Sequence, residues 1–235
     1  MKKIVFAALF LAIAISTQAQ YGINAGYKTM NADKWDAYFG NDDFLQSGFK
    51  VGIDYWFRLK KKRIEFTPEL SYSRFSVDMQ RSNGINGEEF TSLFYSFAFN
   101  TNIYPLNFED DCNCPTFGKA GGILDKGFFI QLSPVVSLID NRYKSENTEV
   151  STNTVAFGIG GGLGLDIGLN DFTTLTPMVN LLYYPSVEWE GLEGLVFIGG
   201  NEPATEGDET SGITQLFVGL KLGIRFDEMN KYGYR

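Results

Sequence analysis

Residues 215–226 read QLFVGLKLGIRF, and every second side chain in this stretch is apolar. The apolar series runs from Leu216 to Phe226, and the alternate series places Lys221 and Arg225 among glycines. Successive side chains of a β-strand point to opposite faces. A period of two therefore predicts a strand with one apolar and one polar face.

The same alternation recurs through most of the chain. It predicts eight strands, at residues 20–28, 49–59, 64–72, 93–103, 128–138, 155–167, 174–184 and 215–226. Most of these are close to the roughly 9–11 residues that a tilted strand needs to cross a bilayer. Beyond the N-terminal segment no stretch has a convincing helical period, so we expect no other helix.

The two faces of these strands cannot both point into one dry core, because one of them carries many charges. A soluble barrel buries the apolar face, whereas a membrane barrel buries the polar face. A smooth apolar band and a glycine-rich sixth strand favour the membrane barrel. Long connections (29–46, 80–90, 139–153 and 185–212) that alternate with short ones near 60–63 and 169–171 favour it too, although connection 105–127 is also long. We predict an all-β fold: a single eight-stranded antiparallel up-and-down transmembrane β-barrel.

The polar face of such a barrel lines a lumen that side chains can fill. Charges inside it must pair, because a lone buried charge is costly. We therefore predict a lumenal ion-pair network made by Lys50, Asp54, Arg58, Glu65, Glu69, Asp166, Lys221 and Arg225. The network is either a plug that holds the barrel together or a path for protons or ions, and we favour the plug.

The N-terminal segment has the features of a secretory signal peptide. Lys2 and Lys3 precede an apolar run that is too short to span a bilayer, and Thr17-Gln18-Ala19 offers a small-residue cleavage site. We predict a signal peptide at residues 1–19 and a barrel at 20–235. The net charge of −8 argues against a nucleic-acid partner.

The chain contains no histidine. Membrane-barrel hydrolases and acyltransferases generally need one to transfer protons near neutral pH. We therefore expect no enzymatic activity, no catalytic residue, no cofactor and no metal.

Cys112 and Cys114 are the only cysteines and flank Asn113 before Pro115. This pair can close a small disulfide or contribute to a soft-metal site. We favour a disulfide that stiffens a periplasmic turn over a metal or redox role.

The last long connection is acidic and lacks Lys and Arg. Its carboxylates are Glu188, Glu190, Glu193, Glu202, Glu206, Asp208 and Glu209. Such a loop can bind divalent cations or a basic partner, but we favour a solvated external loop. The first connection contains a candidate contact patch, made by Trp35, Tyr38 and Phe39. Here too we favour a loop without a binding role.

Three stretches resemble outer-membrane β-barrel proteins common in Bacteroidota, of the PorT-like and OmpA-barrel-like kind. They are YGINAG at 21–26, NTNIYPL at 100–106 and GIGGGLG at 158–164. The resemblance implies an integral protein of the cell outer membrane, and some members of the group serve type IX secretion. The chain departs from the usual pattern in its cysteine turn and in continuing past Phe226.

Outer-membrane lipid is the expected surroundings, and other envelope proteins are candidate partners. The first hypothesis for function is a structural or protein-interaction barrel. The alternatives are an accessory part of a type IX-like secretion machine and a narrow pore or transporter for small apolar molecules.

Overall fold

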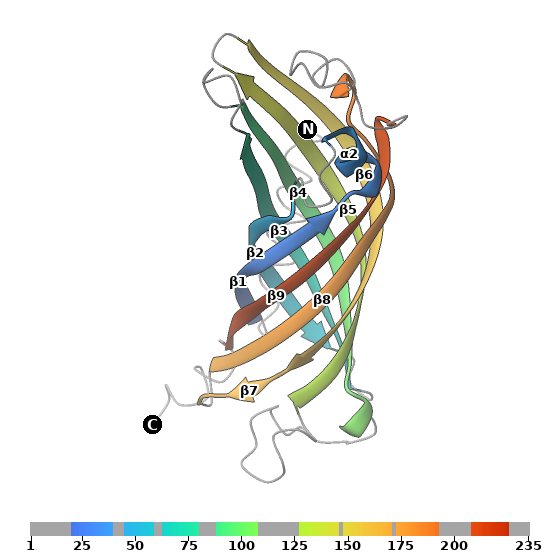
Figure 1. Ribbon diagram of the computed structural model, residues 1–235. Coiled ribbons are helices and arrows are strands. Elements are labelled where there is room, and N and C mark those ends of the chain that lie inside the picture. Colours follow the sequence, from blue (N-terminus) through green and yellow to red (C-terminus); the bar gives the residue numbers. More distant parts are fainter. Residues whose placement is uncertain are drawn as a thin grey trace, which may run out of the picture.

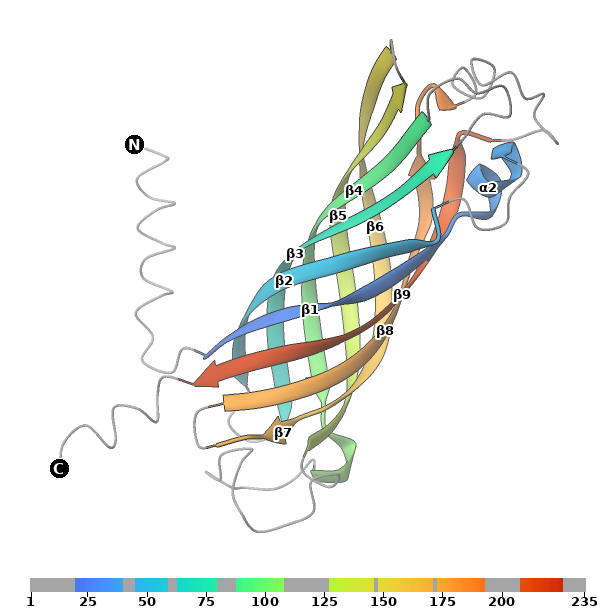
Figure 2. The same cartoon turned by 60° about the vertical axis from the view of Figure 1, so that its left-hand side comes forward.

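The computed structural model describes residues 20–39, 45–58, 63–79, 88–107, 127–145, 148–170, 173–192 and 208–225. One antiparallel sheet, rolled into a barrel, accounts for nearly all of them (Figures 1 and 2). Its strands are β1 (Gln20–Asn31), β2 (Ser47–Arg58), β3 (Ile64–Met79), β4 (Glu88–Ile103), β5 (Phe128–Ser145), β6 (Thr148–Leu165), β7 (Ile167–Gly168), β8 (Thr173–Glu188) and β9 (Thr210–Arg225).

Backbone pairing joins each barrel strand to two neighbours, so the sheet closes into a complete barrel. β1 pairs with both β2 and β9, and β6 pairs with β8 as well as with β5. The short β7 pairs with β8 in the register that β6 began, so β6 and β7 are one strand interrupted at Asp166. The predicted eight-stranded antiparallel up-and-down barrel is therefore confirmed.

The direction of the side chains follows the predicted alternation. Ile23 and Phe157 are 60% and 72% exposed on the outer surface, whereas their polar neighbour Asn24 is 1% exposed inside. The exposed large apolar side chains come from all eight barrel strands. An apolar outer band around a polar interior is the surface of a transmembrane barrel.

Several strands are longer than the sequence pattern indicated. β5 and β6 pair as far as Ser145 and Thr148, so the predicted long connection at 139–153 is wrong. β4 begins at Glu88 and β8 runs to Glu188, which shortens the connections expected at 80–90 and 185–212. Beyond the apolar band the outward residues become polar, so the alternation disappears from the sequence while the strands continue.

The expectation of no further helix is also wrong. Helix α2 (Asp33–Phe39) follows β1, and a short 3-10 helix, η1 (Pro105–Asn107), follows β4. The Asp36 carboxylate accepts a hydrogen bond of 3.4 Å from the backbone N–H of Ala32, which caps the first turn of α2. In the part of the chain that the structure describes, no helix has the length and apolarity to span a membrane.

Glycines on the inner face of β6 make room for large side chains on both neighbouring strands. A Cβ atom at Gly164 would lie 2.2 Å from Cζ of the buried Phe129 on β5. A Cβ at Gly162 would lie 1.8 Å from Oδ1 of Asn180 on β8. The outward-facing Gly161 is different, because its Cβ would meet only a backbone oxygen at 3.6 Å.

These distances predict a contrast between two alanine substitutions on the same strand. Gly164→Ala should destabilise the barrel by about 1–3 kcal/mol, because its Cβ would overlap the buried Phe129 ring and force that ring to shift. Gly161→Ala should change stability by less than about 0.5 kcal/mol. Urea unfolding of both variants in lipid vesicles measures the difference, and equal stability would contradict the packing role of Gly164.

Candidate functional site

The middle of the lumen holds a fully satisfied carboxylate. Lys50 on β2 and Glu69 on β3 are both buried, and Lys50 Nζ lies 2.6 Å from Glu69 Oε1. Two amide side chains, Asn24 and Asn100, donate hydrogen bonds of 3.1 and 3.3 Å to the other oxygen of Glu69. Lys50 Nζ also lies 4.6 Å from the centre of the Phe217 ring. Each buried charge therefore lies next to an opposite charge, and Glu69 also accepts two hydrogen bonds, which offsets the cost of burying the pair.

A second ion pair crosses the first strand. Lys221 Nζ on β9 lies 2.6 Å from Asp54 Oδ1 on β2, although β1 lies between these two strands. Gly22 occupies the crossing point, and a Cβ there would lie 2.6 Å from both Asp54 Oδ2 and Lys221 Cε. The missing side chain at position 22 therefore permits the pair.

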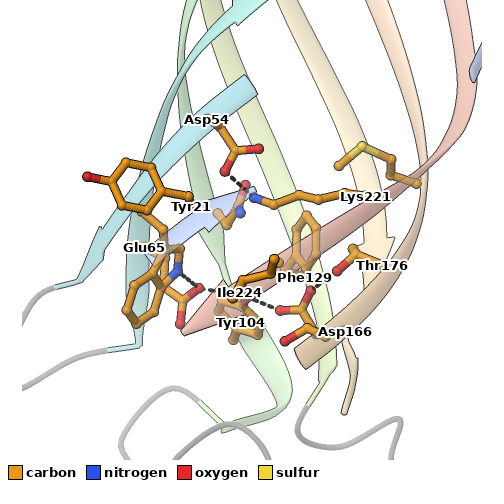
Figure 3. A pocket seen from close by; sticks show the side chains of 14 residues that line it. Tyr21, Asp54, Glu65, Tyr104, Phe129, Asp166, Thr176, Lys221 and Ile224 are labelled. Atoms are coloured by element: carbon orange, nitrogen blue, oxygen red, sulfur yellow. Dashed lines mark hydrogen bonds and ion pairs between the residues drawn. The ribbon is translucent and has the colours of Figure 1, made fainter. Parts of the chain in front are cut away.

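The third cluster lies at the end of the lumen near β7 (Figure 3). The Tyr104 hydroxyl oxygen lies 2.8 Å from Glu65 Oε2 and 2.6 Å from Asp166 Oδ2. The Trp56 indole N–H donates to Glu65, and the Thr176 hydroxyl donates to Asp166. The cluster joins residues of three strands, β2, β3 and β8, with one residue just after β4 and one between β6 and β7, which ties this end of the barrel together.

Tyr104 is the centre of this cluster and follows the last residue of β4. Burial, and then the charges of Asp166 and Glu65, raise the pKa of its hydroxyl well above the usual value. The hydroxyl therefore stays protonated and remains a donor at neutral pH. Arg63 supports the ring from outside, with its guanidinium carbon 4.3 Å from the ring centre.

Two small cavities lie between these described groups. One cavity of about 50 Å³ lies beside Glu65, Tyr104 and Asp166. Another of about 40 Å³ lies beside Lys50 and Glu69. Each has room for only a few water molecules.

The structure brings six of the eight predicted lumenal residues into three contacting groups. They are Lys50 with Glu69, Lys221 with Asp54, and Glu65 with Asp166 through Tyr104. The side chains of Arg58 and Arg225 lie outside the described residues. The sequence pattern predicted that Asp166 lies within the strand 155–167. Instead it lies in the break between β6 and β7, where its backbone N–H donates to the Gly127 carbonyl.

The sequence reasoning missed the uncharged partners and one lysine. Lys28 lies on the predicted inner face of β1, and its Nζ donates to Ser73 Oγ at 3.4 Å. Asn24 and Asn100 also lie on predicted inner faces, so the alternation that identified the charges marks them too. Tyr104 gave no such signal, because it lies beyond the end of a strand.

The opposite end of the lumen is rich in aromatic side chains. Trp35 from α2 packs edge-on against Trp189, with ring centres 5.3 Å apart. Phe90 and Tyr143 pack below them at 4.9 Å. The Trp35 indole N–H donates to the Glu209 carbonyl at 3.0 Å. We call the aromatic layer formed by Trp35, Phe75, Phe90, Phe94, Tyr143, Tyr184 and Trp189 the apolar cap.

The apolar cap corrects one expectation about the first connection. Trp35 is fully buried, so it is not part of an exposed contact patch. The side chains of Tyr38 and Phe39, proposed with it, lie outside the described residues.

Four of the seven acidic-loop residues lie in the described part of the chain: Glu188, Glu190, Asp208 and Glu209. Lys34 of α2 approaches Asp208 to 2.6 Å, and its hydrogen bond lowers the pKa of that carboxyl. The Glu209 side chain accepts a hydrogen bond of 2.9 Å from the Gly191 N–H. Glu193, Glu202 and Glu206 lie outside the described residues.

The described ranges contain no group of three His, Cys, Asp or Glu residues placed to hold a metal ion. Cys112 and Cys114 lie outside these ranges, so their pairing stays a prediction.

Comparison with known proteins gives similarity of architecture. No protein-family model matches the chain, and no curated protein matches it. Among solved structures it is similar to neisserial surface protein A (11% identity, TM-score 0.48, covering 88% of this chain and 97% of that one). It is also similar to Ail of Yersinia pestis (10% identity, TM-score 0.47, covering 88% of this chain and 99% of that one). The N-terminal β-barrel domain of Pseudomonas aeruginosa OprF is a third example (14% identity, TM-score 0.36, covering 88% of this chain and 97% of that one).

Proposed function

We propose that this chain is a non-enzymatic outer-membrane β-barrel with a plugged lumen, which acts through the surface at its capped end. The observation that carries the proposal is the filling of the lumen at successive levels. The Tyr104 cluster fills one end, the Lys50 and Lys221 ion pairs fill the middle, and the apolar cap fills the other end. A barrel filled in this way offers its outer surfaces for function.

The outer band of apolar side chains supports contact with outer-membrane lipid. The predicted signal peptide and the resemblance to Bacteroidota barrels agree with this location. We place the capped end outside the cell and the β7 end in the periplasm, because two of the three connections at the β7 end, 59–63 and 169–172, are as short as the periplasmic turns of such barrels.

The absence of histidine from the chain supports a role without catalysis. Four lumenal carboxylates also have partners in the structure. Glu69 and Asp54 form ion pairs with lysines, and Glu65 and Asp166 lie within hydrogen-bonding distance of the Tyr104 hydroxyl. The interaction role calls for other envelope proteins as partners. An accessory role in a type IX-like secretion machine is a special case, which requires a stable and stoichiometric partner set in a pull-down from outer membranes.

The alternative of a narrow pore makes an opposite prediction. We expect the purified chain to give no single-channel steps in planar bilayers, because described side chains cross the lumen at three levels. A wide-lumen porin incorporated in the same way is the positive control, and heat-modifiable gel migration verifies that the sample is folded. Reproducible steps from the folded chain would contradict the plugged lumen and favour the pore.

A further inference from the structure

The ends of β5 and β6 form a hairpin that rises beyond the rest of the barrel (Figures 1 and 2). On the outward face of β5 the last exposed large apolar residue is Leu138, and the positions after it are Asp140, Arg142 and Lys144. On β6, Glu149 is one of the polar residues at the corresponding positions. The hairpin therefore extends past the apolar band, by about 20 Å at 3.3 Å per residue.

One edge of this hairpin has no partner among the described residues. β6 pairs with β5 along residues 148–165, but its pairing with β8 begins only at Ile159, opposite Tyr183. Gly158 still lies beside Tyr183 and Tyr184 of β8, but residues 148–157 have a neighbouring described strand, β5, on one side only. Backbone N–H and C=O groups along such an edge are a template for another strand.

The strands part because β8 bends away. The register of β8 with β9 shifts by one residue between Tyr184 and Val187, which is a β-bulge. Pro185 lies within the bulge and has no N–H to donate. These features protect the β8 side of the gap against further pairing.

The β6 edge has none of this protection. Residues 148–158 read TEVSTNTVAFG, with no Pro, no Lys and a single charge at Glu149. Its β-branched residues, including Val150, Thr152 and Val155, favour an extended conformation. Natural proteins usually protect a long edge with Lys, Pro or a bulge. The contrast with β8 therefore marks the β6 edge as a surface for strand addition.

We infer that the β6 edge binds an extended segment of another protein, which adds to the sheet as a further strand and carries a basic residue opposite Glu149. This inference rests on the proposed interaction function and names its partner class. Main-chain hydrogen bonds give such strand addition its affinity, and alternate side chains give it specificity.

Cross-strand neighbours on the hairpin specify the basic residue. The outward row that ends at Glu149 contains Asp78, Glu89 and Lys144 on the preceding strands. Glu149 has Lys144 on one side, and its other side is the edge. A Lys or Arg there would form a favourable opposite-charge pair. On the inner face, Val150 lies opposite Tyr143, so the next residue of the added strand would be apolar.

A second copy of this chain fits the edge less well. Two copies in one membrane share one orientation, so their β6 strands would run in the same direction. Two such edges can face each other only across a two-fold axis parallel to the strands, which sets the outward face of one copy against the inward face of the other and so breaks the continuity of the two faces of the sheet.

The inference can be tested with a synthetic peptide that alternates Val and Thr around one central Lys. We expect it to bind the full chain in lipid nanodiscs and to protect alternate backbone amides of residues 148–153 from hydrogen exchange. The same peptide with N-methyl groups on alternate residues should not bind, because it keeps its side chains but loses its edge donors. A version with Glu in place of Lys should bind more weakly.

Two matched variants locate the site. Glu149→Gln should weaken binding of the lysine peptide by about two- to fivefold, the range expected for one cross-strand charge pair. Glu89→Gln removes the same charge from the same row on β4, a strand paired on both sides there, and should leave affinity unchanged.

Three results would overturn the inference: no binding by the lysine peptide, equal binding by its N-methylated form, or protection of the β6 amides without peptide in nanodiscs that hold two barrels. The last result would mean self-pairing. None of them changes the bilayer test of the plugged lumen, so failure of this inference and failure of the proposed function are distinguishable.

Discussion

Lys50→Met is expected to lower the free energy of unfolding by about 3–5 kcal/mol, because it leaves Glu69 charged, buried and without its cation. Glu69 is 5% exposed and its ion pair with Lys50 is 2.6 Å long. Asn24 and Asn100 still donate to Glu69 in the variant, but neutral amides do not replace the lost charge. Urea unfolding in lipid vesicles, followed by tryptophan fluorescence, gives the loss.

A double variant distinguishes the cost of leaving the Glu69 charge unpaired from the cost of losing the packing of the Lys50 side chain. Lys50→Met with Glu69→Gln removes both charges and keeps an oxygen that can accept from the two asparagines. We expect it to recover most of the lost stability. A single variant as stable as the natural protein would show that the pair is not needed, and a double variant as unstable as the single one would assign the loss to packing around Lys50.

Trp189→Ala is expected to cost about 3–5 kcal/mol and to release helix α2 from the mouth of the barrel. Trp189 is 1% exposed and packs against Trp35 of α2 and Phe90 of β4, with ring centres 5.3 and 6.3 Å away. Its removal leaves a cavity in the middle of the apolar cap. The released helix should then be cut more rapidly by trypsin after Lys34.

Val150→Ala is the matched control, since Val150 is an apolar residue at the same end of the molecule but is 36% exposed. It should cost less than about 1 kcal/mol and leave cleavage at Lys34 unchanged. Equal cleavage of Trp189→Ala and the natural protein would mean that α2 is held without the apolar cap.

Alternation in the sequence was sufficient to predict the fold, because one face of each barrel strand contacts lipid and the other face lines the polar lumen. Ile23 and Asn24 are adjacent in the chain, yet they are 60% and 1% exposed. That difference follows from the direction of their side chains alone. The same pattern identified Lys50, Asp54, Glu65, Glu69 and Lys221 as lumenal.

The choice of partners was not predictable in the same way. Alternation says which face a residue occupies but not its height in the lumen. The pairing of Lys50 with Glu69 and of Lys221 with Asp54 depends on strand register and on the absence of a side chain at Gly22. Register is fixed by packing between strands, which a single strand does not reveal.

The ends of the barrel were the least predictable part. Trp35 lies in a short helix that is buried only because Trp189, far along the chain, packs against it. The hairpin of β5 and β6 continues where neither face contacts lipid, so nothing in its outward residues marks it as strand. Tertiary contacts outweigh local pattern at both places.

The ion pair across β1 has a consequence for how the barrel is completed. Asp54 belongs to the second strand of the chain and Lys221 to the last, and both flank the seam at which the first and last strands meet. Until the C-terminal strand docks, Asp54 faces the interior without this cation. The docking of β9 beside β1 therefore completes this part of the barrel and pairs the Asp54 charge in the same step. A barrel that lacks its last strand keeps an unpaired carboxylate next to the open seam.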